Sequence, residues 1–447
     1  MPRALCPIPR AWRVAGTVPL LVLLASSLAA QAPVRAFRGA QLHPIAGPPI
    51  EQGVLVVEGG RILAVGGSST TIPRGAEVID VGGKVILPGL VDTHSHLGSV
   101  SGGDRSAPLH PGVRALDSID VRSDSFWRAR AGGITTINVM PGSGLLMSGQ
   151  TVYIKLRRDP RTIDDWLFCD DPIGGICGAM KMANGTNPLD PPPQSGSRAK
   201  SAALVRALYV KAQEYQHKVD EAAADSAKKA PPRDLELEAL LQVLRGERIV
   251  QHHTHRHNDI ATVLRLQQEF GFRVVIQHGS EAWKVADQLA AAKVPVSITF
   301  IDAPGGKEEV LGWRLDAPAI LERAGVDVGF NTDDWITDSR LLLRAPALAV
   351  RYGMSREKAL EGVTLAAARM LGLEERVGSL EPGKDADFVV LSGDPLSVYT
   401  QVEETWVEGE RVFDRDDPEH RRFAVGGYRV YRDLATHHDV LESEAHQ

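Results

Sequence analysis

The stretch Ile86–Gly98, ILPGLVDTHSHLG, decides the fold and holds the first candidate site. An apolar run ends in an acidic residue, and two histidines, His94 and His96, follow with one residue between them. Side chains at positions i and i+2 of a strand project to the same face, so these two imidazoles can bind one cation at the strand's end. A strand that ends in two solvated histidines carries the same pattern. The remaining ligands must therefore be sought elsewhere in the chain.

The middle of the chain alternates apolar, β-branched runs with segments of helical spacing, such as Asp259–Phe270 and Ala282–Ala292. Eight such runs predict an α/β fold, a closed (β/α)8 TIM-like barrel rather than an open sheet. The third run also fits a hairpin or an insertion strand. The runs are Lys84–Val91, Gly133–Met140, Thr151–Leu156, Gly175–Met182, Arg248–His253, Arg273–His278, Val294–Phe300 and Val326–Thr332.

Both ends of the chain have a different texture, with short strands and tight turns. The segment GVLVVEGGRILAVGG has a Gly-Gly hairpin signal between two β-branched runs, and GKDADFVVLSGD and VEETWVEGERVF repeat this texture near the other end. We expect residues 34–87 and 371–430 to build one small composite β-sandwich domain. The barrel then covers residues 88–370.

An oversized connection at about residues 187–247 interrupts the barrel pattern. It opens with the loop-forming LDPPPQSGSR and continues as a charged helical stretch from about Ala199 to Ala224. On a barrel this insertion would rise from the face that carries the active site and could cover it. A solvated helical decoration fits the sequence equally well.

The N-terminus has the order of a secretory signal peptide. Arginines precede the short apolar segment Val14–Leu24, and small residues follow it, so we expect residues 1–30 to be removed and the protein to be exported to the periplasm or the cell exterior. An uncleaved anchor is the alternative, although the apolar segment is short for a membrane span. Removal leaves Cys169 and Cys177, which could form one bridge or stay as two thiols.

The overall charge of -6 excludes a basic footprint for nucleic acid and favours a small-molecule substrate. No stable membrane span is expected after signal removal, and homo-oligomerisation stays open.

Residues able to bind metal collect at the ends of five predicted strands. A barrel brings these strand ends to one rim, where imidazoles and a carboxylate form a nitrogen and oxygen ligand set suited to Zn²⁺. The chain has 14 histidines in 447 residues, so random placement would rarely put metal-binding residues at five strand ends. The residues are His94, His96, Lys181, His253, His255, His278 and Asp333.

With these motifs in place, the chain resembles the metal-dependent hydrolases of the amidohydrolase superfamily, in the imidazolonepropionase-like or dipeptidase-like branch. The resemblance rests on GLVDTHSHL at the first strand, VVIQHGSEA at the sixth, FNTDD at the eighth and VGSLEPGKDADFVVL at the return to the β domain. In the last motif Gly378 and Gly383 allow the turns that the chain needs there. The motifs together cover nearly the whole mature chain.

The resemblance implies a role for each matching residue. His94 and His96 would bind one Zn²⁺ or another divalent transition metal, and His253 and His278 would hold a second position. Asp333 would bind metal and move protons as the catalytic residue. Lys181 would be carbamylated and bridge two ions, or would instead contact a substrate carboxylate, with Lys155 a weaker competitor.

Substrate contacts are expected from side chains that follow these strands. His255 is interpreted as a substrate or ligand-supporting contact, and the other candidates are Gln150, Asn184 and Arg256.

The implied activity is hydrolysis of an amide, peptide or cyclic amide C–N bond by water that the metal activates. A deaminase of the same superfamily is the second hypothesis, although such enzymes often have Glu three residues after the strand-five histidine, where this chain has Arg256. The third is a non-catalytic binding protein on the same fold. The substrate itself cannot be read from the sequence.

Overall fold

The structure is a computed structural model that describes residues 33–98, 100, 103–189, 196–299, 307–334 and 336–426. The predicted signal peptide lies outside the described residues. Strands from both ends of the chain share one eight-stranded sheet, in the order β17-β16-β15-β5-β1-β2-β3, with β4 beside β1. Its strands are β1 (Arg35–Leu42), β2 (Ile50–Glu58), β3 (Arg61–Gly66), β4 (Glu77–Asp80), β5 (Val85–Pro88), β15 (Phe388–Leu391), β16 (Val402–Val407) and β17 (Glu410–Asp414).

Backbone pairing joins the two chain ends in this sheet. Strands β5 and β15 are antiparallel, with Pro88 opposite Phe388. The predicted Gly-Gly hairpin is confirmed, because β2 and β3 pair antiparallel around Gly59 and Gly60, whose φ angles are 57° and 80°. Side chains such as Phe37, packed edge-on against Phe388 at 4.9 Å between ring centroids, fill the core of the sheet.

The central strands lie in two further sheets. One has the order β14-β13-β12-β11-β10-β8, in which β10 to β14 are parallel, and the other has the order β6-β7-β9. A parallel bridge between Ser95 and Asp334 connects the end of β6 to the end of β14. The strands are β6 (Leu90–Ser95), β7 (Ile134–Val139), β8 (Met147–Gln150), β9 (Val152–Lys155), β10 (Met180–Ala183), β11 (Val250–Thr254), β12 (Val274–His278), β13 (Val296–Thr299) and β14 (Val328–Asn331).

The third predicted run departs from the parallel pattern. Strand β9 pairs antiparallel with β7, and β8, just before it, pairs antiparallel with β10. Parallel neighbours need a crossover of a dozen or more residues, usually a helix, and the described residues between β7 and β9 contain only β8. Because this connection contains a strand in place of a crossover helix, β9 adopts the hairpin-like antiparallel pairing that the sequence left open.

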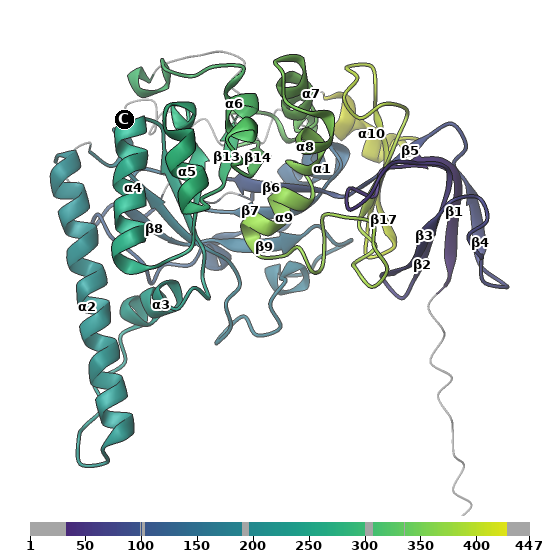
Figure 1. The fold of residues 1–447 in the computed structure, drawn as a ribbon. Helices are drawn as coiled ribbons and strands as arrows, with labels where there is room; N and C mark the ends of the chain where they lie inside the picture. The colour runs from purple at the N-terminus through teal and green to yellow at the C-terminus, as the bar shows by residue number, and fades with distance from the viewer. Residues whose placement is uncertain are drawn as a thin grey trace, which may run out of the picture. The chain divides into compact units, whose positions relative to one another are not determined.

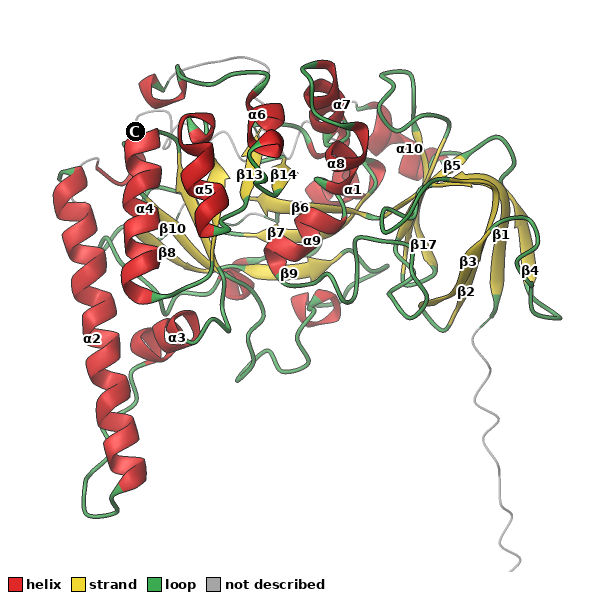
Figure 2. Ribbon diagram, in the orientation of Figure 1, coloured by secondary structure: helices red, strands yellow, loops and turns green. Residues whose placement is uncertain are grey.

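Helices flank the central strands (Figure 2). The predicted helix Asp259–Phe270 is confirmed as α4, and the predicted helix Ala282–Ala292 is a 3-10 turn, Ala282–Val285, continued by α5. Besides the insertion, the helices are α1 (Asp124–Ala131), α4 (His257–Phe270), α5 (Ala286–Ala292), α6 (Ala317–Arg323), α7 (Arg344–Arg351), α8 (Arg356–Glu361), α9 (Leu365–Leu371) and α10 (Pro418–Val425).

The insertion forms α2 (Arg198–Ala224) and α3 (Leu235–Leu244), and α2 runs beside α4 (Figure 1). Tyr209 of α2 is fully buried, and its ring stacks on Phe270 and Phe272 at 5.0 and 5.4 Å between centroids. One face of α2 is thus packed against the α/β core. No helix in the described ranges has an apolar stretch long enough to cross a membrane.

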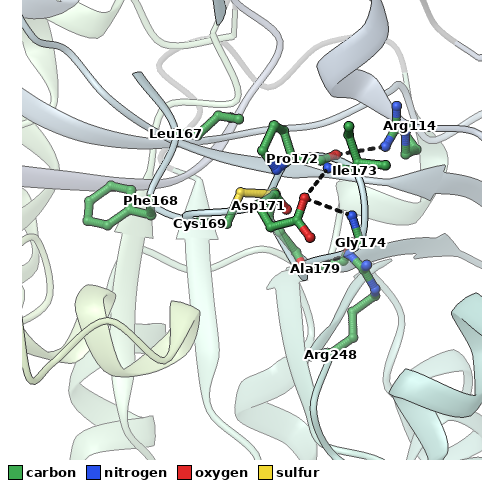
Figure 3. Close-up of a disulfide and its surroundings, with 12 residues drawn as sticks. Arg114, Leu167, Phe168, Cys169, Asp171, Pro172, Ile173, Gly174, Ala179 and Arg248 are labelled. Carbon is green, nitrogen blue, oxygen red and sulfur yellow. Dashed lines mark hydrogen bonds between the residues drawn. A yellow bond between two sulfur atoms is a disulfide. The ribbon is translucent and has the colours of Figure 1, made fainter. Parts of the chain in front are cut away.

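Cys169 and Cys177 form a disulfide in the segment that leads to β10 (Figure 3). Their Cα atoms are 5.0 Å apart, within the normal range for a bridge. Inside the loop that they close, the Asp171 carboxylate accepts hydrogen bonds from the backbone N–H groups of Ile173 and Gly174. The bridge, which the sequence left open, therefore closes a turn already ordered by an aspartate.

Candidate active site

The ends of β6 and β14 are joined by a buried carboxylate. Asp92 Oδ1 accepts hydrogen bonds from the backbone N–H groups of His94 (3.2 Å) and Thr332 (3.1 Å), and its Oδ2 accepts from the Thr332 hydroxyl. Burial raises the pKa of Asp92 to about 7, although these hydrogen bonds act to lower it. Asp333 N donates to His94 O at 2.9 Å, so the brace sets Asp333 beside the two predicted histidine ligands.

His94, His96 and Asp333 form a compact group of three donors, whose ligand atoms all lie within 4.8 Å of one another. Asp333 Oδ1 is 3.5 Å from His94 Nε2 and 3.1 Å from His96 Nε2, and the two Nε2 atoms are 3.3 Å apart. His94 is fully buried. Two imidazole nitrogens and one carboxylate oxygen at this spacing are a donor set that Zn²⁺ accepts.

The other ring nitrogen of each histidine is held by a hydrogen bond. His96 Nδ1 donates to Met140 O at 2.8 Å, and His94 Nδ1 lies 3.3 Å from Gln277 Oε1, an acceptor. A proton on Nδ1 leaves the Nε2 lone pair available, which is the tautomer that a metal ligand needs. The arrangement thus fixes both rings for binding through Nε2.

Two further histidines, His253 and His278, complete the centre of the site. Their ring centroids are 4.5 Å apart, and the His278 ring is 4.7 Å from that of His94. Both ring nitrogens of His253 lack a hydrogen-bond partner among the described residues, and so does Nε2 of His278. Burial lowers the pKa of His278 to about 3 and that of His253 well below its usual value, so both rings are neutral.

Asp333 is ionised in this setting. Burial acts to raise its pKa, but the neighbouring imidazoles of His94, His278 and His96 hold the pKa of the carboxyl well below its ordinary value. Its backbone has a φ of 45°, and that of His278 has a φ of 70°, a left-handed conformation that non-glycine residues rarely adopt. Strain of this kind is concentrated at functional sites, where the surrounding structure enforces it.

The two candidate lysines have different surroundings, although both are fully buried. Lys181 Nζ lies 3.2 Å from His94 Nε2, at the centre of the histidine group. Lys155 instead pairs with the buried carboxylates of Asp385 and Asp387, two of the acidic residues of the motif that returns to the β domain. The structure therefore places Lys181, and not Lys155, at the candidate site.

The remaining predicted contacts differ in their distance from this centre. His255 faces the histidine group, with its ring 4.7 Å from that of His253, and its Nδ1 lies 2.8 Å from Ser280 Oγ. Asn184 donates through Nδ2 to Asp259 O. Gln150 pairs with Met180, at the start of β10 and away from the end that carries the histidines.

Gln150 donates through Nε2 to Pro111 O, a loop carbonyl. Arg256 is partly exposed and immediately precedes α4. The substrate contacts of Gln150, Asn184, Arg256 and His255 stay predictions.

A polar cluster borders the site at the start of α4. Glu281 accepts hydrogen bonds from the His257 ring at 2.7 Å and from Lys284 Nζ at 2.6 Å. Burial acts to raise the pKa of Glu281, but these two donors lower it to about 2. His252 points elsewhere and lines a small cavity together with residues of α2 such as Val205.

The sequence reasoning missed two residues near the centre, Glu309 and Arg198. Glu309 is buried, and its ligand atoms lie within 4.8 Å of those of His253 and His255. Arg198, the first residue of α2, reaches Glu309 at 3.6 Å and Asp259 at 3.0 Å. The sequence before Glu309 has no strand or helix pattern, so only its position in Lys307-Glu308-Glu309 after the seventh run could have drawn attention to it.

The described strands thus form an α/β fold in which histidines and an aspartate collect at the strand ends. The model of an amidohydrolase family matches residues 211–413. A solved structure of an amidohydrolase from Thermotoga maritima MSB8 is 33% identical, with a TM-score of 0.77, and the match covers 85% of this chain and 100% of that one.

Curated relatives extend the comparison. The amidohydrolase tasK of Hapsidospora irregularis is 26% identical over 81% of this chain, which spans only 40% of that longer protein. An imidazolonepropionase of Erwinia tasmaniensis is 25% identical over 76% of this chain and 86% of that protein. The chain belongs to the amidohydrolase superfamily and is imidazolonepropionase-like, with the α/β fold of that superfamily.

Proposed function

We propose that this protein is a metal-dependent hydrolase that cleaves an amide, peptide or cyclic amide C–N bond of a small molecule. The observation that carries the proposal is the group formed by His94, His96 and Asp333, with both histidine rings held through Nδ1 so that Nε2 faces the carboxylate. The relatives support the reaction class, because enzymes of this superfamily act on C–N bonds.

The residues present fit a bound cation. His253 and His278 bury ring nitrogens that have no partner among the described residues, and such atoms cost about 1–3 kcal/mol each when left unsatisfied. A ligand that accepts their lone pairs would remove this cost. We therefore propose His94, His96 and Asp333 as ligands of one divalent ion, Zn²⁺ or a related transition metal, and His253 and His278 as ligands of a second position.

A bound divalent ion would supply Lewis acidity toward the substrate carbonyl and toward water. The chain's own residues hold the Asp333 carboxylate in place and use it to move protons. Asp333 presents an ionised carboxylate beside the imidazoles of His94 and His96, so it can accept a proton from the attacking water and return it to the leaving nitrogen. The brace from Asp92 and Thr332 keeps this carboxylate in place during both transfers.

We propose that the neutral amine of Lys181 adds to CO₂ and loses a proton, and that the resulting carbamate would supply anionic oxygen ligands to both metal positions. Lys181 Nζ lies 3.2 Å from His94 Nε2, and an unmodified ammonium there would repel a cation. The test is Lys181→Ala, which should lower the metal content by about half and recover activity when short carboxylic acids are added. Unchanged metal content would show that Lys181 binds no metal.

The central strands are proposed to close into a (β/α)8 TIM-like barrel, and the sheet from the two chain ends to form a composite β-sandwich. The bridge between Ser95 and Asp334 supports closure, because it joins the first strand of the series to the last. Export is proposed from the arginine-flanked apolar segment at the N-terminus.

The decisive experiment combines metal analysis with a substrate screen. The purified chain, loaded with Zn²⁺, is offered dipeptides, N-acyl amino acids and cyclic amides, and hydrolysis is followed together with ammonia release from amino-substituted heterocycles. Asp333→Asn should keep most of the metal yet lose hydrolysis. Hydrolysis by metal-free protein would refute the proposal, and ammonia release without amide cleavage would make the protein a deaminase.

A further inference from the structure

A second group of potential ligands lies beside the first and includes two residues without an assigned metal role. His253, His255 and Glu309 are all buried, and their ligand atoms lie within 4.8 Å of one another. The rings of His253 and His255 stand edge to face, with centroids 4.7 Å apart. The group combines residues of β11 with a carboxylate from the segment after β13.

Three polar atoms of this group are unsatisfied within the described residues. Both ring nitrogens of His253 and the Glu309 Oε1 atom have no hydrogen-bond partner within the described part of the chain. A buried carboxylate oxygen is costly to leave without a donor or a cation, and an imidazole that pairs with nothing is also unfavourable. The His253 ring therefore makes no hydrogen bond within the described residues, and Glu309 keeps Oε1 for a cation. The His255 ring is held through Nδ1 by Ser280, so its Nε2 is the atom that would bind.

The other oxygen of Glu309 is held from two sides. The backbone N–H of Thr186 donates to Oε2 at 3.0 Å, and Arg198 Nη2 lies 3.6 Å from the same atom. Gly185 has a φ of +83°, and a Cβ there would lie 2.7 Å from Oε2, so the loop after β10 is shaped around this carboxylate. These contacts position one oxygen and leave Oε1 available.

The charge of the pocket favours an anionic ligand at this position. Imidazole ligands bring no charge to a metal, so the first group of His94, His96 and Asp333 contributes one negative charge, to which the carbamate proposed for Lys181 would add another. A second divalent ion a few ångströms away would raise the net positive charge of a buried site, which is unfavourable at low dielectric. A carboxylate from Glu309 would offset part of that charge.

We propose that Glu309 and His255 join His253 in binding the second divalent transition-metal ion, at the position proposed above for His253 and His278. This inference rests on the proposed function, because it assumes a cation at His94, His96 and Asp333. It assigns His255 as a ligand, in place of a substrate contact. It also connects the helical insertion to the site, because Arg198 at the start of α2 helps to position the Glu309 carboxylate.

The test compares Glu309→Gln with Glu308→Gln, a matched control, because Glu308 is the exposed neighbour in the same turn. The full chain is stripped of metal and titrated with Zn²⁺, and bound metal is counted by elemental analysis. Wild type and Glu308→Gln should bind about two equivalents. Glu309→Gln should bind about one tightly, with the affinity for the second lowered by more than about 100-fold.

His255→Asn provides an independent second variant if Glu309→Gln fails to fold, as judged by circular dichroism. It should also lose the second equivalent and keep the first. A parallel titration with Co²⁺ gives a spectroscopic readout, in which the visible absorption of the second equivalent should be missing from both variants.

Two results would overturn the inference: a wild-type protein that binds one equivalent only, or Glu309→Gln and His255→Asn variants that match Glu308→Gln. These results are distinct from failure of the proposed function. Two equivalents in a protein that hydrolyses no C–N bond would refute the function and leave the second ion in place. A wild-type protein that binds no metal would refute both.

Discussion

Replacing Lys155 by methionine tests whether the two buried lysines have separate roles. Lys155 Nζ pairs with Asp385, lies 3.0 Å from Asp387 Oδ2 and 3.3 Å from Glu408 Oε1, and its side chain is fully buried. Methionine fills a similar volume but leaves the buried carboxylates without this ammonium. Breaking a buried ion pair from one side costs about 3–5 kcal/mol, so Lys155→Met should lower the free energy of unfolding by that amount.

The loss should depend on pH. Burial raises the pKa of Asp387 above its ordinary value, and Lys155 opposes that rise. Without Lys155 the pKa of Asp387 rises further, so the folded state binds a proton more tightly than the unfolded state. A raised folded-state pKa contributes stability at low pH that is lost as the pH rises. The destabilisation of Lys155→Met should therefore be smaller at pH 5 than at pH 8.

The assay is urea unfolding of wild type, Lys155→Met and Lys181→Met at both pH values, with metal content measured on the folded proteins. Lys155→Met should unfold at lower urea yet keep its metal, whereas Lys181→Met should lose metal. A Lys155→Met protein within about 1 kcal/mol of wild type at pH 8 would refute the reasoning, because the buried carboxylates would then not depend on the lysine.

Three further predictions concern the insertion, the disulfide and the rim of the site. Tyr209→Ala should destabilise the protein by about 3–5 kcal/mol in thermal unfolding, whereas the exposed Val210→Ala should stay within about 0.5 kcal/mol; equal effects would mean that α2 is not packed as described. Cys169→Ser with Cys177→Ser should cost up to about 2.5 kcal/mol, from a sequence separation of 8, and a reducing agent should then have no further effect. Glu281→Gln should have a lower free energy of unfolding than wild type at neutral pH, and this difference should vanish as the pH falls from 4.5 toward 2. The reason is that the lowered pKa of Glu281 stabilises the fold only where the carboxyl is ionised. A difference in unfolding free energy that does not change with pH would contradict this.

Much of the fold could be predicted because it depends on local patterns. The parallel strands β10 to β14 coincide with five of the eight predicted runs, and the Gly-Gly hairpin follows from residues that tolerate positive φ. The antiparallel direction of β9 could not be predicted from the sequence, because the residue pattern within a strand does not depend on whether its neighbour runs parallel or antiparallel. Its partner strand and the connection before it, which contains a strand and no crossover helix among the described residues, decide the pairing.

The sequence by itself determined that histidines and an aspartate end the strands, since alternation and strand boundaries are local properties. The separate surroundings of Lys181 and Lys155 were decided only by the tertiary structure, because both lysines lie in similar apolar runs and differ in which distant residues approach them. Glu309 is the clearest case. Its segment has no periodicity, and only the folding of three separate segments places His253, Arg198 and Thr186 around its carboxylate.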